Sequence, residues 1–211
     1  MEPDTREQPE EIRQLQQEPP KQKKIKERKA FNIVVTGING TGKTTIIKKF
    51  VIAALKAGQR VLVVTPDPAE WTTLPEIHER FRERIEWYKG GRRMIYQKGD
   101  LKLINDYYRN GLLVFDDCRV YLDAKTSDEI HTVLIRRRQF MLDLIFVAHG
   151  FTEIPPKFFT FADHFIIFKT LDSIDVRKQQ LGSSFKNIKK VVEDVNQEAE
   201  KNEFNYKIVK R

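Results

Sequence analysis

Residues 37–44 have the types and spacing needed to hold a chain of phosphates. Their sequence, GINGTGKT, fits the pattern G-x-x-x-x-G-K-[ST], and it stands directly after an apolar run and directly before a helical pattern. Glycines let the backbone wrap around phosphate oxygens, and the N–H groups at the start of the following helix present partial positive charge to them. The segment therefore predicts a nucleoside triphosphate site.

Individual residues of this loop have separate predicted roles. Lys43 is expected to reach the β- and γ-phosphates as a point charge, and the Thr44 hydroxyl is expected to ligate Mg²⁺. A glycine-rich turn without a ligand is the disfavoured alternative, because the motif lies between a strand and a helix. We predict ATP and Mg²⁺ as cofactors. The residues expected to bind the nucleotide are Gly37, Asn39, Gly40, Thr41, Gly42, Lys43, Thr44 and Thr45.

Two carboxylates follow the apolar run at 112–115, which is the pattern of a Walker B strand. Asp116 is expected to hold Mg²⁺ through water, so that Thr44 and Asp116 form the metal site. Asp117 would lie past the strand end near the γ-phosphate, where a carboxylate orients and deprotonates an attacking water. Asp117 is therefore the candidate general base. The alternative is a pair of carboxylates that merely ends a strand.

A polar side chain also ends the apolar run at 144–148. His149 would lie at the carboxyl edge of the sheet, where ligands bind in open α/β folds, and is a candidate sensor of the γ-phosphate. The alternative is a hydrogen-bonded loop residue. A capping-box pattern at 126–129 starts a helix that ends in Arg136, Arg137 and Arg138, for which a solvated helix face is the alternative to a function.

A parallel sheet is needed to bring these residues together. From residue 30 onward, short apolar runs alternate with helical stretches, which predicts an α/β fold with a mostly parallel sheet flanked by helices. The expected strands cover 31–35, 61–65, 112–115, 144–148 and 165–168, and the expected helices cover 43–56 and 127–140. Weaker patterns predict helices over 101–109 and 185–201, followed by a strand-like end over 206–209.

Composition separates a tail from one folded unit. Residues 1–29 are rich in Pro, Glu and Gln and almost free of apolar residues, so we expect a disordered charged tail ahead of one P-loop domain over 30–211. The single cysteine, Cys118, excludes an intramolecular disulfide. No apolar run reaches the roughly 18 residues of a membrane span, and no signal peptide is visible. We expect a soluble protein located in the cytoplasm.

The formal net charge of +8 favours a polyanionic partner such as nucleic acid, and it also fits an ordinary basic surface. Cations interleave with aromatic residues between the second and third expected strands, where they would grip phosphates and stack on bases. The alternative is a charged amphipathic helix with its aromatics in the core, ended by Gly90 and Gly91. The cations are Arg80, Arg82, Arg84, Lys89, Arg92, Arg93 and Lys98, and the aromatics are Phe81, Trp87, Tyr88 and Tyr96. The two interpretations weigh equally, because Glu79, Glu83 and Glu86 dilute the patch.

The order of these features over 31–170 resembles the FtsK–HerA superfamily of DNA-pumping ATPases. Segment 136–149 is similar to the family's arginine-rich helix end, apolar strand and terminal glutamine, and 61–68 resembles its second strand and proline-containing acidic turn. The resemblance implies a sheet of the additional-strand type. It also implies that Arg138 is an arginine finger, which projects into the nucleotide of a neighbouring subunit and stabilises phosphoryl transfer.

Two positions depart from the family pattern. The family usually has Glu where this chain has Asp117 and Gln where it has His149, so the departures leave binding intact and bear on the rate of hydrolysis. Lys43, Asp117, Arg138 and His149 are the catalytic residues that the resemblance implies. In size the chain looks most like the small viral genome-packaging ATPases.

The resemblance implies an ATP-hydrolysing DNA translocase, a genome-packaging motor subunit that acts in a homo-oligomeric ring, expected to be a hexamer. Its implied partners are double-stranded DNA and a capsid or membrane-anchored portal component, and its implied location is the host cell cytoplasm or the virion. Two other functions stay open. A small-molecule, nucleotide-type kinase shares the phosphate loop, and a nucleotide-switch assembly protein would bind ATP without hydrolysing it.

Overall fold

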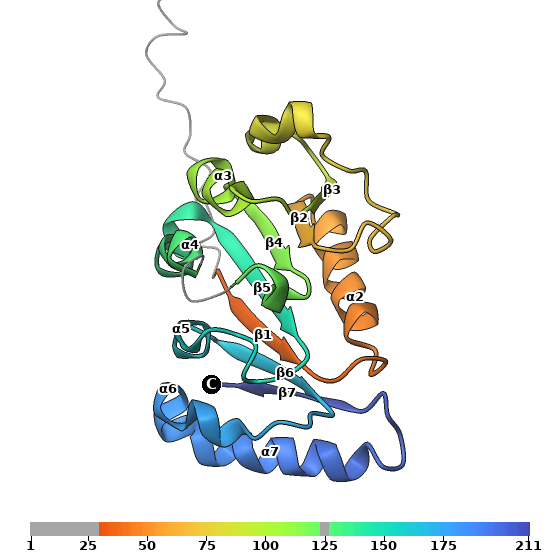
Figure 1. Ribbon diagram of the computed structural model, residues 1–211, viewed down its shortest axis with the longest axis vertical. Coiled ribbons are helices and arrows are strands. Elements are labelled where there is room, and N and C mark those ends of the chain that lie inside the picture. Colours follow the sequence, from red (N-terminus) through yellow and green to blue (C-terminus); the bar gives the residue numbers. More distant parts are fainter. Residues whose placement is uncertain (1–29, 123–126) are drawn as a thin grey trace, which may run out of the picture.

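A seven-stranded sheet forms the centre of the computed structural model, which describes residues 30–122 and 127–211 (Figure 1). The strands lie in the order β3-β2-β4-β5-β1-β6-β7. Their bounds are β1 Asn32–Thr36, β2 Arg60–Thr65, β3 Gly91–Ile95, β4 Gly111–Phe115, β5 Leu142–Ala148, β6 His164–Phe168 and β7 Tyr206–Lys210. The pairs from β3 to β6 are parallel, and β7 runs antiparallel to β6. The predicted α/β class and mostly parallel sheet are confirmed.

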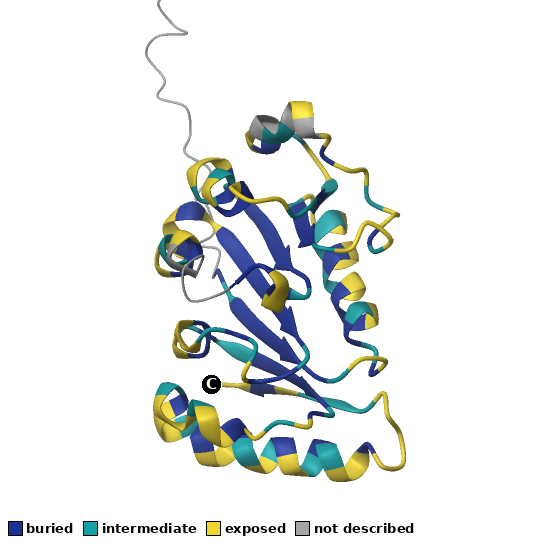
Figure 2. Ribbon diagram, in the orientation of Figure 1, coloured by how far each residue is buried: buried dark blue, intermediate teal, exposed yellow. Residues whose placement is uncertain are grey.

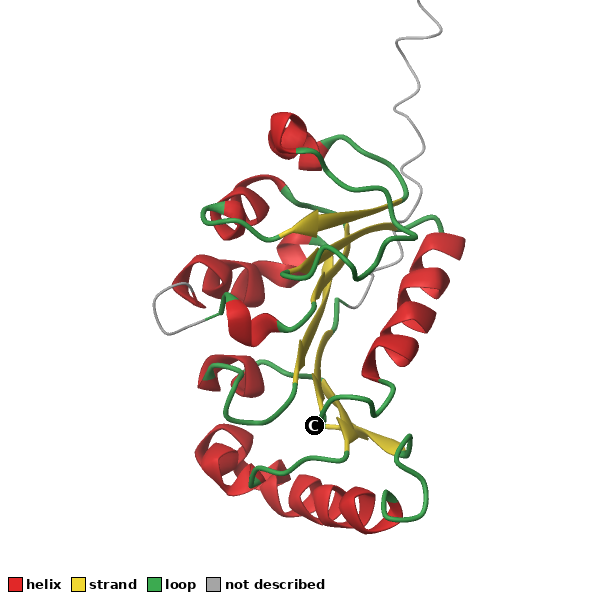
Figure 3. Ribbon diagram, turned by 45° about the vertical axis from the view of Figure 1, so that its right-hand side comes forward, coloured by secondary structure: helices red, strands yellow, loops and turns green. Residues whose placement is uncertain are grey.

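Helices flank this sheet on both faces. The α-helices are α2 Lys43–Lys56, α3 Asp100–Tyr107, α4 Ser127–Phe140, α5 Pro156–Thr160, α6 Lys178–Leu181 and α7 Phe185–Glu198. Short 3₁₀ helices are η1 Glu79–Glu86, η2 Cys118–Val120, η3 Ile174–Arg177 and η4 Gly182–Ser184. Figure 3 shows α2 on one side of the sheet and α3, α4 and α5 on the other. None of the helices in 30–122 and 127–211 has the length and apolar character of a membrane span.

Strand β5 is the additional strand of this sheet. It pairs with β1 on one side, where Thr36 lies beside Ala148, and with β4 on the other, where Phe115 lies beside Phe146. All three strands run in the same direction, so their carboxyl ends meet at one edge. The phosphate loop, the acidic pair and the histidine follow these three ends. The predicted additional-strand type is therefore confirmed.

The core lies in two layers, one on each face of the sheet (Figure 2). Side chains alternate along β1, so that Val34 packs toward the layer under α3 and α4 while Ile33 and Val35 pack with Ile47 of α2. Every residue of β1, β4 and β5 is buried. Burial on both faces explains why these strands are continuous apolar runs rather than alternating ones.

The C-terminal part of the chain covers the β6 side of the sheet. Helix α7 buries Phe185, Ile188, Val192 and Val195, whose spacing of three and four residues places them on one face. Strand β7 then pairs with β6, with Tyr206 opposite Phe168. The expected helix and strand-like end are confirmed, with the helix ending earlier than expected.

Three expectations require comment. The structure has a strand, β3, that was not expected, and the segment before it forms the 3₁₀ helix η1 instead of an amphipathic helix running to Gly90 and Gly91. The helix expected over 101–109 is α3, displaced by one or two residues. The tail at 1–29 and the first residue of the capping-box pattern, Thr126, lie outside the described residues.

Candidate nucleotide-binding site

The loop between β1 and α2 has a backbone shape that depends on its glycines. Gly37 packs so tightly against β6 that an added Cβ would lie 2.4 Å from Cβ of Phe168. Gly42 precedes α2 with a φ of 89°, a left-handed conformation that glycine adopts readily. The Thr41 hydroxyl donates to the carbonyl oxygen of Ile38 at 2.9 Å. These contacts hold the loop at the N-terminus of α2, where N–H groups favour an anion.

Lys43, the first residue of α2, is buried at the centre of the site. Its ammonium group donates to the carbonyl oxygens of Gly37 and Ile38, the second at 2.8 Å, and lies 3.3 Å from Nδ1 of His149. Burial lowers the pKa of Lys43, and the carboxylates at the end of β4 oppose that shift. Hydrogen bonds from an ammonium to phosphate oxygens are stronger than those to neutral carbonyls. Lys43 is therefore placed to exchange its present partners for phosphate.

Asp116 follows β4 and is 8% exposed. One of its carboxylate oxygens accepts a hydrogen bond from the indole Nε1 of Trp71 at 2.6 Å, and its carbonyl oxygen accepts one from the hydroxyl of Tyr121 at 2.8 Å. Burial raises the pKa of the Asp116 carboxyl, and the Trp71 hydrogen bond opposes that rise. A bound cation would favour the ionised form. No sequence motif marks Trp71, which lies 45 residues before its partner.

Asp117 and His149 meet at the carboxyl ends of β4 and β5. Oδ1 of Asp117 lies 3.4 Å from Nε2 of His149, and the other ring nitrogen of His149 faces Lys43. A lysine ammonium only donates, so we assign Nδ1 as the acceptor and place the proton of the neutral ring on Nε2, facing Asp117. The imidazole thus connects the expected phosphate-binding lysine to the candidate base.

The pKa of His149 gives a testable prediction. Burial lowers it from 6.5, and the positive charge of Lys43 lowers it further. The neutral form of the ring should be favoured at pH 6.5, because protonation would place a second cation against Lys43, although Asp117 partly opposes the shift. An NMR titration, with the resonance assigned by His149→Gln, should give a midpoint below 6.5 that rises in Lys43→Ala. A midpoint that Lys43→Ala leaves unchanged would contradict the contact.

Arg119 and Glu153 extend this cluster, and the sequence did not indicate either. Nε of Arg119 lies 3.0 Å from Oδ1 of Asp117, and its NH1 lies 3.3 Å from Oε1 of Glu153. The other oxygen of Glu153 accepts a hydrogen bond from the backbone N–H of His149 at 2.7 Å. Asp117 itself has φ of 44° and ψ of 52°, a left-handed conformation that Asp tolerates better than most residues. The cluster therefore holds the orientation of the candidate base.

A cavity of about 550 Å³ opens where these residues meet. Most of the predicted site residues line it, namely Asn39, Gly40, Gly42, Lys43, Thr44, Thr45, Asp116, Asp117 and His149. Gly37 and Thr41 do not line it, and they act instead on the shape of the loop. The wall also contains residues that were not predicted: Thr65, Pro66, Asp67 and Glu70 after β2, Arg119 after β4, and Phe204 before β7.

The donors expected for Mg²⁺ both face this cavity. Thr44 offers a hydroxyl and Asp116 a carboxylate, which are the hard oxygen ligands that Mg²⁺ prefers. Within residues 30–122 and 127–211, no group of three or more His, Cys, Asp or Glu is arranged to hold a metal. Thr44 and Asp116 are compatible with Mg²⁺, which usually keeps several waters and binds through one or two carboxylates and substrate phosphates.

The three arginines at the end of α4 have different surroundings. Nε of Arg136 donates to Gln139 at 3.0 Å, Arg137 is buried with NH2 3.1 Å from Oδ2 of Asp163, and Arg138 is exposed. All three precede the amino end of β5, whereas the phosphate loop follows the carboxyl end of β1. The length of β5, about 20 Å, therefore separates Arg138 from the loop of its own chain. Its role as an arginine finger stays a prediction.

Two tyrosines of the basic and aromatic segment after β2 are engaged in packing. The ring of Tyr88 lies under the guanidinium of Arg60, whose carbon is 4.6 Å from the ring centroid, and Tyr96 stacks on Tyr121 at 4.6 Å between centroids. The packing interpretation therefore holds for the two tyrosines. Trp87 differs, since it is 76% exposed.

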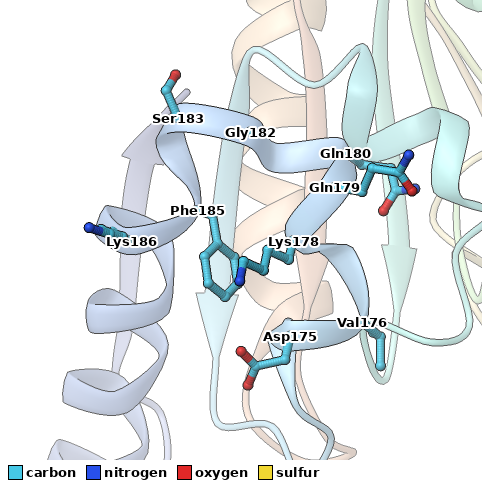
Figure 4. A pocket seen from close by; sticks show the side chains of 9 residues that line it. All are labelled: Asp175, Val176, Lys178, Gln179, Gln180, Gly182, Ser183, Phe185 and Lys186. Atoms are coloured by element: carbon cyan, nitrogen blue, oxygen red, sulfur yellow. The ribbon is translucent and has the colours of Figure 1, made fainter.

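A larger hollow of about 870 Å³ lies between α6, η4 and the start of α7 (Figure 4). Lys178 extends over the ring of Phe185, with Nζ 5.9 Å from the centroid, and Asp175 pairs with Lys189 at 2.9 Å. Lys186 points away from these residues in Figure 4. The polar groups of this hollow do not converge as those around Lys43 do, so the cavity at the phosphate loop is the candidate site.

The phosphate loop at the end of β1, the acidic end of β4 and the strand inserted between them define a P-loop NTPase of the additional-strand type. The fold is similar to that of solved viral genome-packaging NTPases. The genome packaging NTPase B204 from Sulfolobus turreted icosahedral virus 2, in complex with AMPPCP, matches with a TM-score of 0.64 and 17% identity, over 86% of this chain and 92% of that chain. The DNA-packaging ATPase B204 from Sulfolobus turreted icosahedral virus matches with a TM-score of 0.60 and 18% identity, over 85% and 92%.

Sequence comparison adds one partial match. Residues 11–75 match the family described as methylmalonyl Co-A mutase-associated GTPase MeaB. This stretch includes the phosphate loop and β2 and covers less than a third of the chain. No curated protein matches the sequence.

Proposed function

We propose that this chain hydrolyses ATP and uses the energy to translocate double-stranded DNA as one subunit of a ring. The observation that carries the proposed hydrolysis is the distance of 3.4 Å between Asp117, after β4, and His149, after the additional strand β5. Lys43 lies beside His149. A carboxylate, a neutral imidazole and an ammonium in this order are suited to activate a water next to a terminal phosphate.

The roles of the residues in this reaction follow from their contacts. Asp117 accepts the proton of the attacking water while the water oxygen forms a bond to the γ-phosphorus and the bond to the leaving ADP oxygen breaks. The Nε2–H of His149 and Nε of Arg119 face Oδ1 of Asp117, which orients the carboxylate. Lys43 binds phosphate oxygens. Mg²⁺, held by Thr44 and Asp116, would neutralise the charge that develops on the phosphates.

Support for translocation comes from the fold and the charge. The similar solved structures are named as genome-packaging enzymes, and the net charge of +8 favours a polyanionic partner. Arg138 is exposed about 20 Å from the loop of its own chain, so a role as arginine finger would require the nucleotide of a neighbouring subunit. We propose a hexameric ring that acts on viral DNA in the host cytoplasm, anchored by a capsid or portal component.

An ATPase assay with and without double-stranded DNA tests this function. Wild type should hydrolyse ATP faster when DNA is added, and Lys43→Ala should be inactive in both conditions because it lacks the phosphate-binding cation. Light scattering in the same buffers should detect a ring when nucleotide is present. If DNA leaves turnover unchanged, the proposed DNA translocation is excluded, and the proposed ATP hydrolysis is not.

One alternative has an observation in its favour. The match of residues 11–75 to a GTPase family is consistent with a nucleotide switch that uses GTP. Turnover measured with GTP in place of ATP separates the two, since a switch of this kind should prefer GTP and ignore DNA. The kinase alternative gains no support, because residues 149–163 after β5 contain no arginine for a lid.

A further inference from the structure

At the edge of the sheet, the phosphate loop lies between the acidic pair that follows β4 and the segment that precedes β7. In the order β4-β5-β1-β6-β7, the acidic pair follows β4, two strands from β1 on one side. Strand β7 lies two strands from β1 on the other side. It runs antiparallel to β6, with Tyr206 opposite Phe168, so its amino end is at the same edge as the loop. The short segment that leads into β7 therefore borders the cavity opposite the carboxylates.

Phe204 belongs to this segment and faces the cavity. It is the only Phe, Tyr or Trp among the described residues that line the cavity, and it is 57% exposed. A Cβ added at Gly42 would lie 3.5 Å from Cδ1 of its ring, so the ring rests against the start of α2. An aromatic side chain that is exposed in the cavity wall is accessible to a ligand.

The backbone around Phe204 is fixed, which distinguishes it from a loosely exposed side chain. Its N–H donates to Oδ1 of Asn202 at 3.1 Å, and the N–H of Asn205 donates to the carbonyl oxygen of Asn202 at 3.0 Å. On the strand side, the ring of Tyr206 packs on Phe168 with centroids 5.1 Å apart. The segment is therefore anchored to the turn that follows α7 and to β6, and β6 packs against Gly37 of the loop.

The direction of a bound triphosphate follows from this arrangement. Its γ-phosphate must lie toward Asp116 and Asp117, because those residues supply the metal site and the base. The phosphates then run along the loop, so the nucleoside end points away from β4 and toward β7. We propose that Phe204 is the platform on which the purine base of the bound nucleotide stacks, an inference that rests on the proposed nucleotide binding. Stacking is tolerant of base identity, so Phe204 should strengthen binding of ATP and GTP alike.

Calorimetric titrations of the full chain with AMPPCP, its guanine counterpart and inorganic tripolyphosphate, each with Mg²⁺, test the platform. Phe204→Ala should weaken binding of both nucleotides by about 5- to 100-fold and leave tripolyphosphate affinity unchanged. Phe204→Trp should restore nucleotide affinity. Ile208→Ala, which removes an exposed apolar side chain of β7 that does not line the cavity, should bind all three ligands as wild type does.

The outcomes separate this inference from the proposed function. Equal nucleotide affinity in wild type and Phe204→Ala would overturn the platform alone. A parallel loss of tripolyphosphate binding would also overturn it, because the substitution would then act on the loop. A wild-type chain that binds none of the three ligands would overturn the proposed nucleotide binding and the platform with it.

Discussion

Replacing Asp117 by Asn should lower ATP turnover by about 10²- to 10⁴-fold and leave nucleotide affinity close to that of wild type. The amide cannot accept the proton of the attacking water. It keeps the size of the side chain, and Asn tolerates the left-handed backbone at this position as Asp does. Steady-state hydrolysis and the affinity for AMPPCP, measured on the same preparations, check both parts.

The matched control is Asp67→Asn, which removes a carboxylate from the wall of the same cavity. Asp67 follows β2, and within the described part of the chain no hydrogen bond or ion pair joins its side chain to His149 or Arg119. Turnover should therefore stay within the order of magnitude of wild type. If both variants lose activity equally, the loss reflects the total charge of the cavity, and Asp117 is not the base. If Asp117→Asn turns over normally, the proposed mechanism is wrong.

Replacing Arg138 by Ala should lower turnover by about 10³- to 10⁵-fold, the range found for arginine fingers, if the side chain reaches the nucleotide of a neighbouring subunit. Nucleotide affinity should change little, because the cation acts on charge that develops during the reaction. Arg136→Ala is the control, since it removes a cation from the same helix end that is bonded to Gln139. Normal turnover in Arg138→Ala would exclude Arg138 as an arginine finger.

A mixing experiment makes the second prediction specific to a ring. Lys43→Ala lacks its own phosphate-binding cation and keeps Arg138, whereas Arg138→Ala keeps its own loop. In mixed rings, some Arg138→Ala subunits would have a Lys43→Ala neighbour, which supplies the missing arginine to an intact loop. The mixture should therefore regain activity that neither variant has alone. A mixture as inactive as its components would exclude a finger donated between subunits.

Local sequence patterns predicted the centre of the site because each part is a short segment with a fixed position in a parallel sheet. The loop, Asp116, Asp117 and His149 all follow strand ends, and parallel strands bring such ends to one edge. The central strands were recognisable because burial on both faces requires continuous apolar runs. The phosphate loop needed no tertiary information at all.

The residues that escaped prediction depend on contacts distant in sequence or on an edge position. Strand β3 contains Arg92 and Arg93 and buries only Met94, so its sequence resembles a charged loop more than a strand. Trp71 and Phe204 reach the site from loops whose paths only the folded chain sets. The left-handed backbone of Asp117 was equally hidden, and it gives a physical reason for Asp at a position where Glu would be strained.

Strand β5 begins at Leu142, shortly after Arg138, and ends at Ala148, directly before His149. It is buried along its whole length and is hydrogen-bonded to strands on both sides. Close-packed interiors transmit strain, so a displacement at one end of such a strand would reach its other end. In the proposed ring, the two ends of β5 would lie next to two different nucleotides, one bound by the same subunit and one bound by the neighbouring subunit. A shift of His149 on release of the terminal phosphate would then displace Arg138. Consecutive subunits would therefore hydrolyse ATP in sequence around the ring.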